Sequence, residues 1–72
     1  MQKYFFDLVG QGRSQYDYRG HVFAAPERAF RFAELIALDL DLRGEGEWLG
    51  WSVNVRNEQG QQYYSVPVPS TS

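Results

Sequence analysis

Few side chains in this sequence could carry out chemistry, and His21 stands out because it is the single histidine. An imidazole is the ordinary general base near neutral pH, and Ser14 and Asp17 lie close to it along the chain. A catalytic triad also needs a defined geometry and an oxyanion site, and no nucleophile elbow or second base is present. Asp7 and Asp17 could pair as carboxylates, but we interpret Asp7 as solvent-facing and Asp17 as the start of a turn. We therefore predict a structural histidine and no enzymatic activity.

Two segments resemble ligand-binding loops in part. From Asp39 to Glu47 the chain matches four positions of an EF-hand calcium loop, but Arg43 takes a ligand position and Gly50 replaces the final bidentate glutamate. The glycines at 10 and 12 lack the third glycine and the following helix of a dinucleotide-binding loop. Cysteine is absent, which excludes thiolate zinc sites. We predict a solvated helix end at 39–47, and neither a metal nor a cofactor.

Length and composition limit the remaining possibilities. The chain has 72 residues and 17% aromatic residues, which indicates one small domain that relies on bulky side chains for its core. No run approaches the ~20 apolar residues of a membrane span, and the absence of cysteine agrees with a cytoplasmic location. A net charge of −2 argues against general attraction to nucleic acid. Residues 1–31 carry +2 and residues 32–72 carry −4, so the two parts could attract each other within or between molecules.

The pattern of apolar residues predicts the elements that must position these side chains. Pro26 suits the first turn of a helix, and apolar residues then recur every three or four positions up to Leu40, which predicts a helix over 26–42 with Gly44 as a left-handed stop. Alternating or strand-forming residues predict strands, and Asn57-Glu58-Gln59-Gly60 predicts a hairpin turn. The predicted strands cover 3–9, 15–19, 21–23, 49–56 and 61–68, the last as an edge strand because of Pro67.

The order hairpin, helix, hairpin predicts an α+β fold. We expect two layers, an antiparallel sheet of about four strands in ββαββ order with one helix on one face. The domain would cover residues 1–68, with a frayed tail over 69–72.

Four segments occur in an order that resembles a family of short, uncharacterised bacterial domains of about this length. They are Tyr4-Phe5-Phe6-Asp7, Asp17-x-x-Gly20, the alanine-rich helix, and Val53-x-Val55 followed by Asn57-x-x-Gly60. Members of that family typically have an acidic residue in place of Asn57 and a polar cap in place of Ala25. The resemblance implies a fold class and no catalytic residue. The chain up to residue 42 is also similar to HicB-like antitoxins, which would imply a toxin as binding partner.

The aromatic residues on the outer face of the sheet suggest one kind of surface. Phe5 and Tyr63, with Lys3 and Arg56 on the same register, are similar in type to the stacking platforms of single-stranded RNA binders. The acidic pI and the lack of a glycine/aromatic signature argue against that reading. We favour packing of these aromatics against loops or a second subunit.

The helix carries more apolar residues than one sheet can cover. Phe32, Leu35 and Leu42 form a second line, and Trp48 adds a large apolar group in a loop. Either this surface binds a partner, or Trp48 folds over Phe32 or Leu35 and completes the core. We predict a small, self-associating protein-interaction module, or one that binds another protein. Its predicted interaction surface comprises Phe5, Phe32, Leu35, Trp48 and Tyr63.

Overall fold

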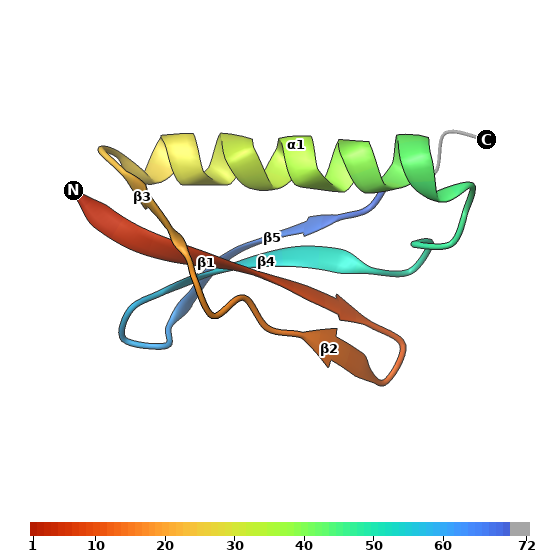
Figure 1. The fold of residues 1–72 in the computed structure, drawn as a ribbon, viewed down its shortest axis with the longest axis horizontal. Helices are drawn as coiled ribbons and strands as arrows, with labels where there is room; N and C mark the ends of the chain where they lie inside the picture. The colour runs from red at the N-terminus through yellow and green to blue at the C-terminus, as the bar shows by residue number, and fades with distance from the viewer. Residues whose placement is uncertain (70–72) are drawn as a thin grey trace.

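The computed structural model describes residues 1–69, which form an antiparallel sheet with one helix across one of its faces (Figure 1). This confirms the predicted two-layer α+β fold. The elements are β1 (Gln2–Gly10), β2 (Arg13–Gln15), β3 (His21–Phe23), α1 (Pro26–Gly44), β4 (Ser52–Asn57) and β5 (Gln62–Pro67). Within residues 1–69, the helix lacks the apolar length that crossing a bilayer requires.

Strand β1 lies in the middle of the sheet and organises it. One edge of β1 pairs with β4, and the other edge pairs with two short strands, β3 near its start and β2 near its end. The strand order is β2-β1-β4-β5, so β5 is an edge strand as predicted. Pro67 is tolerated there because an edge strand has one side without a strand partner.

The second strand is shorter than predicted. We expected it over 15–19, but β2 runs from Arg13 to Gln15 and shares only Gln15 with the prediction, and Tyr16 and Tyr18 are exposed. The reason is Asp17, whose carboxylate accepts the backbone N–H of Phe6 at 3.2 Å. This side chain therefore takes the place of a strand partner in the middle of β1, between β2 and β3.

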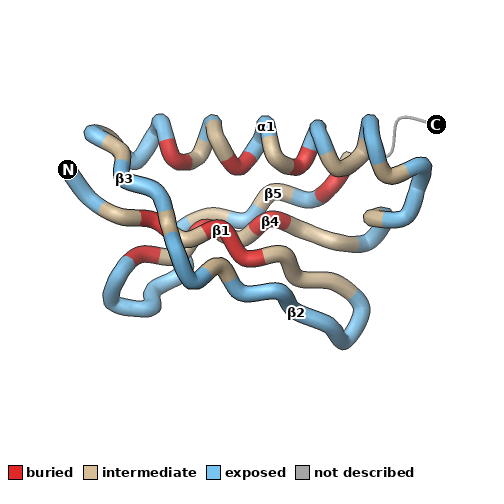
Figure 2. Tube along the Cα trace, in the orientation of Figure 1, coloured by how far each residue is buried: buried red, intermediate tan, exposed pale blue. Residues whose placement is uncertain are grey.

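The core lies between the helix and the middle of the sheet (Figure 2). Ala29, Ala33 and Ala37 are at most 1% exposed, and they face the fully buried Val53 and Val55. Alanine has no side chain beyond Cβ, so the helix can approach the sheet closely. Large side chains then close the flanks of this contact, as with Phe30 of α1, which stacks on Tyr64 at a centroid distance of 4.6 Å.

The helix ends later than predicted, and a different residue adopts the left-handed conformation that terminates it. We expected it to end at 42 with Gly44 in the left-handed conformation, but Gly44 is the last helical residue and Glu45 adopts that conformation, with φ of 50°. Gly44 is required for another reason: a Cβ there would lie 2.4 Å from Cδ1 of Trp48. The glycine makes room for the indole ring.

The second hairpin begins later than predicted. We expected a strand from 49, but residues 45–51 form consecutive turns, and β4 begins at Ser52. The turn after β4 has the expected glycine at positive φ, Gly60 at 86°. The predicted frayed tail over 69–72 lies outside the described residues, except for Pro69.

Candidate functional site

Phe5 and Tyr63 do not share a face of the sheet. The register of β4 and β5 shifts between Val55 and Arg56, and this β-bulge changes the side on which Tyr63 lies. The ring of Tyr63 is 6.5 Å from that of the core residue Tyr4, whereas Phe5 lies on the outer face beneath the Arg56 guanidinium, 4.6 Å from its ring centroid. The aromatic platform considered above is therefore not formed by this pair.

On β4 and β5, the outer face of the sheet carries polar side chains. Ser52 and Ser65 both donate hydrogen bonds from their hydroxyl groups to Oδ1 of Asn54, at 3.2 and 2.7 Å. The second of these contacts joins β4 and β5 across the face away from the helix. Such a surface offers hydrogen-bonding groups to solvent but little apolar area for a partner.

Phe32 belongs to an aromatic cluster beside the core. Its ring centroid is 5.1 Å from that of Phe6, 5.1 Å from that of His21 and 5.6 Å from that of Phe23. His21 thus lies among aromatic rings. Ser14 does not converge with it, because Ser14 pairs with Val9 and His21 pairs with Tyr4. These partners are of opposite parity along β1 and point to opposite faces.

Asp7, Asp17 and Arg56 form a polar node on the outer face. Asp7 was predicted to face solvent, and this prediction is wrong. Asp7 is 4% exposed, and its carboxylate accepts hydrogen bonds from Nε of Arg56 at 2.9 Å, Nη2 of Arg56 at 3.2 Å and the backbone N–H of Asp17 at 3.0 Å. Arg56 is opposite Phe5 in the register, and its long side chain reaches the neighbouring Asp7. The buried Asp7 carboxylate holds the pKa of Arg56 above its ordinary value.

Asp17 begins a turn, as predicted. Its Oδ1 accepts the backbone N–H groups of Arg19 and Gly20, while Oδ2 accepts that of Phe6. Burial alone raises the pKa of the Asp17 carboxyl. The three amide hydrogen bonds and the nearby charge of His21 outweigh burial, so the pKa lies below its ordinary value.

This shift predicts a pH-dependent stability. The stabilising contribution of Asp17 should be fully present above the unfolded pKa of ~3.9, decrease below it, and be lost once the pH falls below the lowered pKa of the folded state. Urea unfolding of the wild type and of Asp17→Asn, which cannot ionise, should therefore give a difference in unfolding free energy that narrows below about pH 4. A difference that stays constant through this range would contradict the prediction.

The leucines on the outside of α1 form an outer helix stripe, defined as Leu35, Leu38 and Leu42. Their exposures are 55%, 42% and 68%, and on a helical projection they lie opposite the buried alanines. Large apolar side chains this exposed, in a row on one small domain, are typical of a surface that binds a partner.

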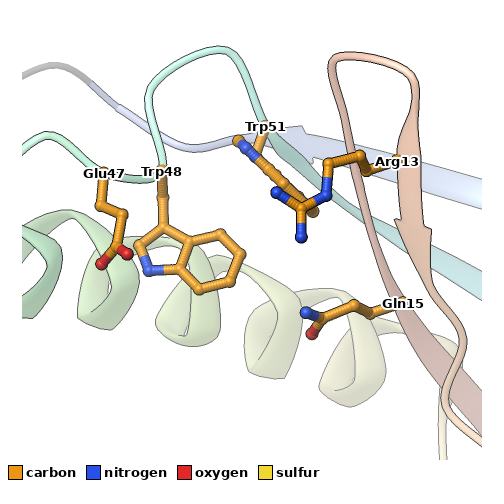
Figure 3. A pocket seen from close by; sticks show the side chains of 5 residues that line it. All are labelled: Arg13, Gln15, Glu47, Trp48 and Trp51. Atoms are coloured by element: carbon orange, nitrogen blue, oxygen red, sulfur yellow. The ribbon is translucent and has the colours of Figure 1, made fainter.

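Trp48 packs against the edge of the core and against the ring of Trp51. The two rings meet edge to face, with centroids 4.9 Å apart and an interplanar angle of 76°. We call this pair the indole corner. It borders a cavity of about 280 Å³ between the 45–51 turns and β2, and the other lining residues are Arg13, Gln15 and Glu47 (Figure 3).

The segment that resembled a calcium loop does not form one. Residues 39–44 belong to the helix, and Asp39 forms an ion pair with Arg43 at 2.9 Å. Within residues 1–69, no three His, Cys, Asp or Glu side chains are grouped so that they could hold a metal ion.

The sequence reasoning missed two groups, the polar node and the pairing of Trp48 with Trp51. The signals for the node were the possible pairing of Asp7 with Asp17 and the presence of Asp7 and Arg56 on strands predicted to belong to one sheet. The signal for the indole corner was the three-residue spacing of the two tryptophans next to Gly46 and Gly50, because glycines favour a turn.

The comparisons with known proteins give the chain its family. A model of a domain of unknown function, DUF6894, matches residues 3–69, which is nearly the whole chain. No curated protein and no solved structure matches it, and the similarity to HicB-like antitoxins stays a prediction. The matched range includes the four segments that carried the resemblance in the sequence, and the chain belongs to this family of domains of unknown function.

Proposed function

We propose that this domain is a non-catalytic protein-interaction module that binds a second copy of itself through the outer helix stripe. The observation that carries the proposal is the exposure of Leu35, Leu38 and Leu42 on the side of α1 away from the core. A core of this size rarely supplies more than ~3–5 kcal/mol, so burial of these leucines in a dimer adds apolar contact that the monomer lacks. A cytoplasmic location is part of the proposal and is supported by the cysteine-free composition.

The spacing along the stripe suits helix pairing. Within α1, Arg31 and the three leucines follow one another at intervals of four, three and four residues, and Glu45, the C-cap residue just past the helix, comes three residues later. This is the seven-residue repeat by which two helices present a continuous seam to each other. The apolar residues occupy the middle of the seam and opposite charges lie at its ends.

The charges favour an antiparallel pair. Arg31 lies seven residues before Leu38 and Glu45 lies seven residues after it. When two helices run antiparallel and cross at Leu38, each Arg31 faces the Glu45 of the other copy. The two helix dipoles then point in opposite directions and attract each other. A parallel pair would bring Arg31 against Arg31.

Charge reversal tests both the association and its direction. Wild-type protein should elute as a dimer in gel filtration with light scattering, and Arg31→Glu should weaken association by about threefold to tenfold, because it places like charges together at both ends. Adding Glu45→Arg to Arg31→Glu should restore association, because the charges at positions 31 and 45 are then exchanged and each pair still joins opposite charges. Arg19→Glu, which changes an exposed arginine in the loop before β3, serves as the control and should have no effect.

Two results would overturn the proposal. A monomer at high concentration would exclude self-association, and purification with a different protein would then identify another partner. Failure of the double variant to regain association would exclude the antiparallel arrangement.

A further inference from the structure

We propose that the indole corner is a binding site for an extended peptide segment that contains proline. The site lies between the 45–51 turns and β2 (Figure 3), and none of the residues that line it belongs to the outer helix stripe. The inference therefore does not depend on self-association.

The two indole rings are held in place before any ligand arrives. A Cβ on Gly10 would lie 2.2 Å from the ring of Trp51, and a Cβ on Gly44 would lie 2.4 Å from the ring of Trp48. Each ring thus packs directly on a glycine, where any other residue would displace it. The edge-to-face contact fixes the rings relative to each other. A site that is already ordered loses little conformational entropy on binding.

The polar groups around the cavity are mostly hydrogen-bond donors. These donors are the guanidinium N–H groups of Arg13 and the amide N–H groups of Gln15, whereas only Glu47 and the Gln15 carbonyl can accept. Within residues 1–69, none of these side-chain groups has a hydrogen-bond partner. A matching ligand is therefore rich in acceptors and poor in donors.

Proline-containing segments have this chemistry. Each proline offers a carbonyl group without an N–H, and its flat apolar ring can pack on an indole face. Such a segment is already extended in solution, which lowers the entropy cost of binding. The volume of about 280 Å³ lies just below the ~300–1,000 Å³ of small-molecule sites, and so suits one or two residues of a peptide.

The charges at the site argue against ionic ligands. Glu47 would repel an anion, and so would the net charge of −2. Arg13 points toward Trp51 in Figure 3 and would repel a cation placed on that ring. A neutral peptide backbone avoids both penalties.

Tryptophan fluorescence tests the site directly, because the only two tryptophans of the chain form the corner. Titration of the full chain with an oligoproline peptide should give a saturable change in emission with a shift to shorter wavelength. A glycine-serine peptide of equal length should give none. No saturable change with oligoproline, an equal response to the glycine-serine peptide, or tighter binding of oligoglutamate would each overturn the proposal.

Variants locate the binding. Trp48→Ala should weaken oligoproline binding by at least about tenfold, as expected for an aromatic anchor, while Trp51 still reports the titration. Gln15→Ala removes an exposed side chain that lines the cavity and should weaken binding by about threefold, the worth of one hydrogen bond. Ser14→Ala is the matched control, because Ser14 is the neighbour of Gln15 on β2 and points to the other face. If Trp48→Ala unfolds, the test rests on the oligoproline affinities of Gln15→Ala and Ser14→Ala. Equal affinities of these two variants would exclude binding at this site.

Discussion

Replacing Arg56 with methionine should destabilise the domain by about 3–5 kcal/mol, because the Asp7 carboxylate would stay buried without its charged partner. The side chain of Asp7 is 6% exposed, and Arg56 supplies two of its hydrogen bonds. Arg56 also donates to the backbone carbonyl of Asp17 and covers the ring of Phe5. Thermal and urea unfolding should show the loss, which approaches the whole stability expected of a domain of this size, ~3–5 kcal/mol.

Two further variants separate the buried charge from other causes. Asp7→Asn combined with Arg56→Met removes the charge and keeps an oxygen for the Asp17 amide, so this double variant should be more stable than Arg56→Met alone. Arg43→Met breaks the ion pair with Asp39, in which the side chains of Arg43 and Asp39 are 81% and 57% exposed. This variant should lower the free energy of unfolding by less than about 1 kcal/mol. Equal losses for Arg43→Met and Arg56→Met would refute the role assigned to burial.

Replacing Leu38 with glutamate should weaken self-association by about a hundredfold or more. The two copies cross at this residue, so the variant places two like charges together in an apolar seam and removes a central apolar contact at the same time. Because Leu38 is 42% exposed in the single chain, the monomer itself should keep its fold. Sedimentation or light scattering over a range of concentrations measures the first effect, and circular dichroism checks the second.

A conservative control belongs with this experiment. Leu38→Met keeps an apolar side chain of similar volume at the seam, so association should change little. If Leu38→Glu and the wild type associate equally, α1 is not the interface, and the proposed function fails even if the indole corner binds peptide.

Local patterns were enough to predict most of the fold. Recurrence of apolar residues at three and four positions, after Pro26, predicted the helix and the alanine face that it buries. Alternation around Val53 and Val55 predicted a strand half-buried in the sheet, and both valines are fully buried. These signals succeed because they depend only on the periodicity of helices and strands.

Predictions that depended on the register of neighbouring strands were less successful. Tyr63 was assigned by alternation to the same face as Phe5, but the bulge in β5 interrupts the alternation. The strand predicted over 15–19 is shortened because Asp17 bonds to Phe6, a residue eleven positions away. Neither a bulge nor such a distant contact has a periodicity that a single sequence reveals.

The helix, the order of the elements, the two-layer α+β class and the surplus of apolar residues on the helix could all be predicted from the amino-acid sequence. Those properties follow from residue type and spacing alone. Tertiary packing determines which of these apolar residues are surplus: Phe32 is packed among aromatic rings, whereas Leu35 stays exposed. It also brought Asp7 to Arg56 and set Trp48 against Trp51, because such contacts depend on strand pairing and on which glycines leave room for a ring.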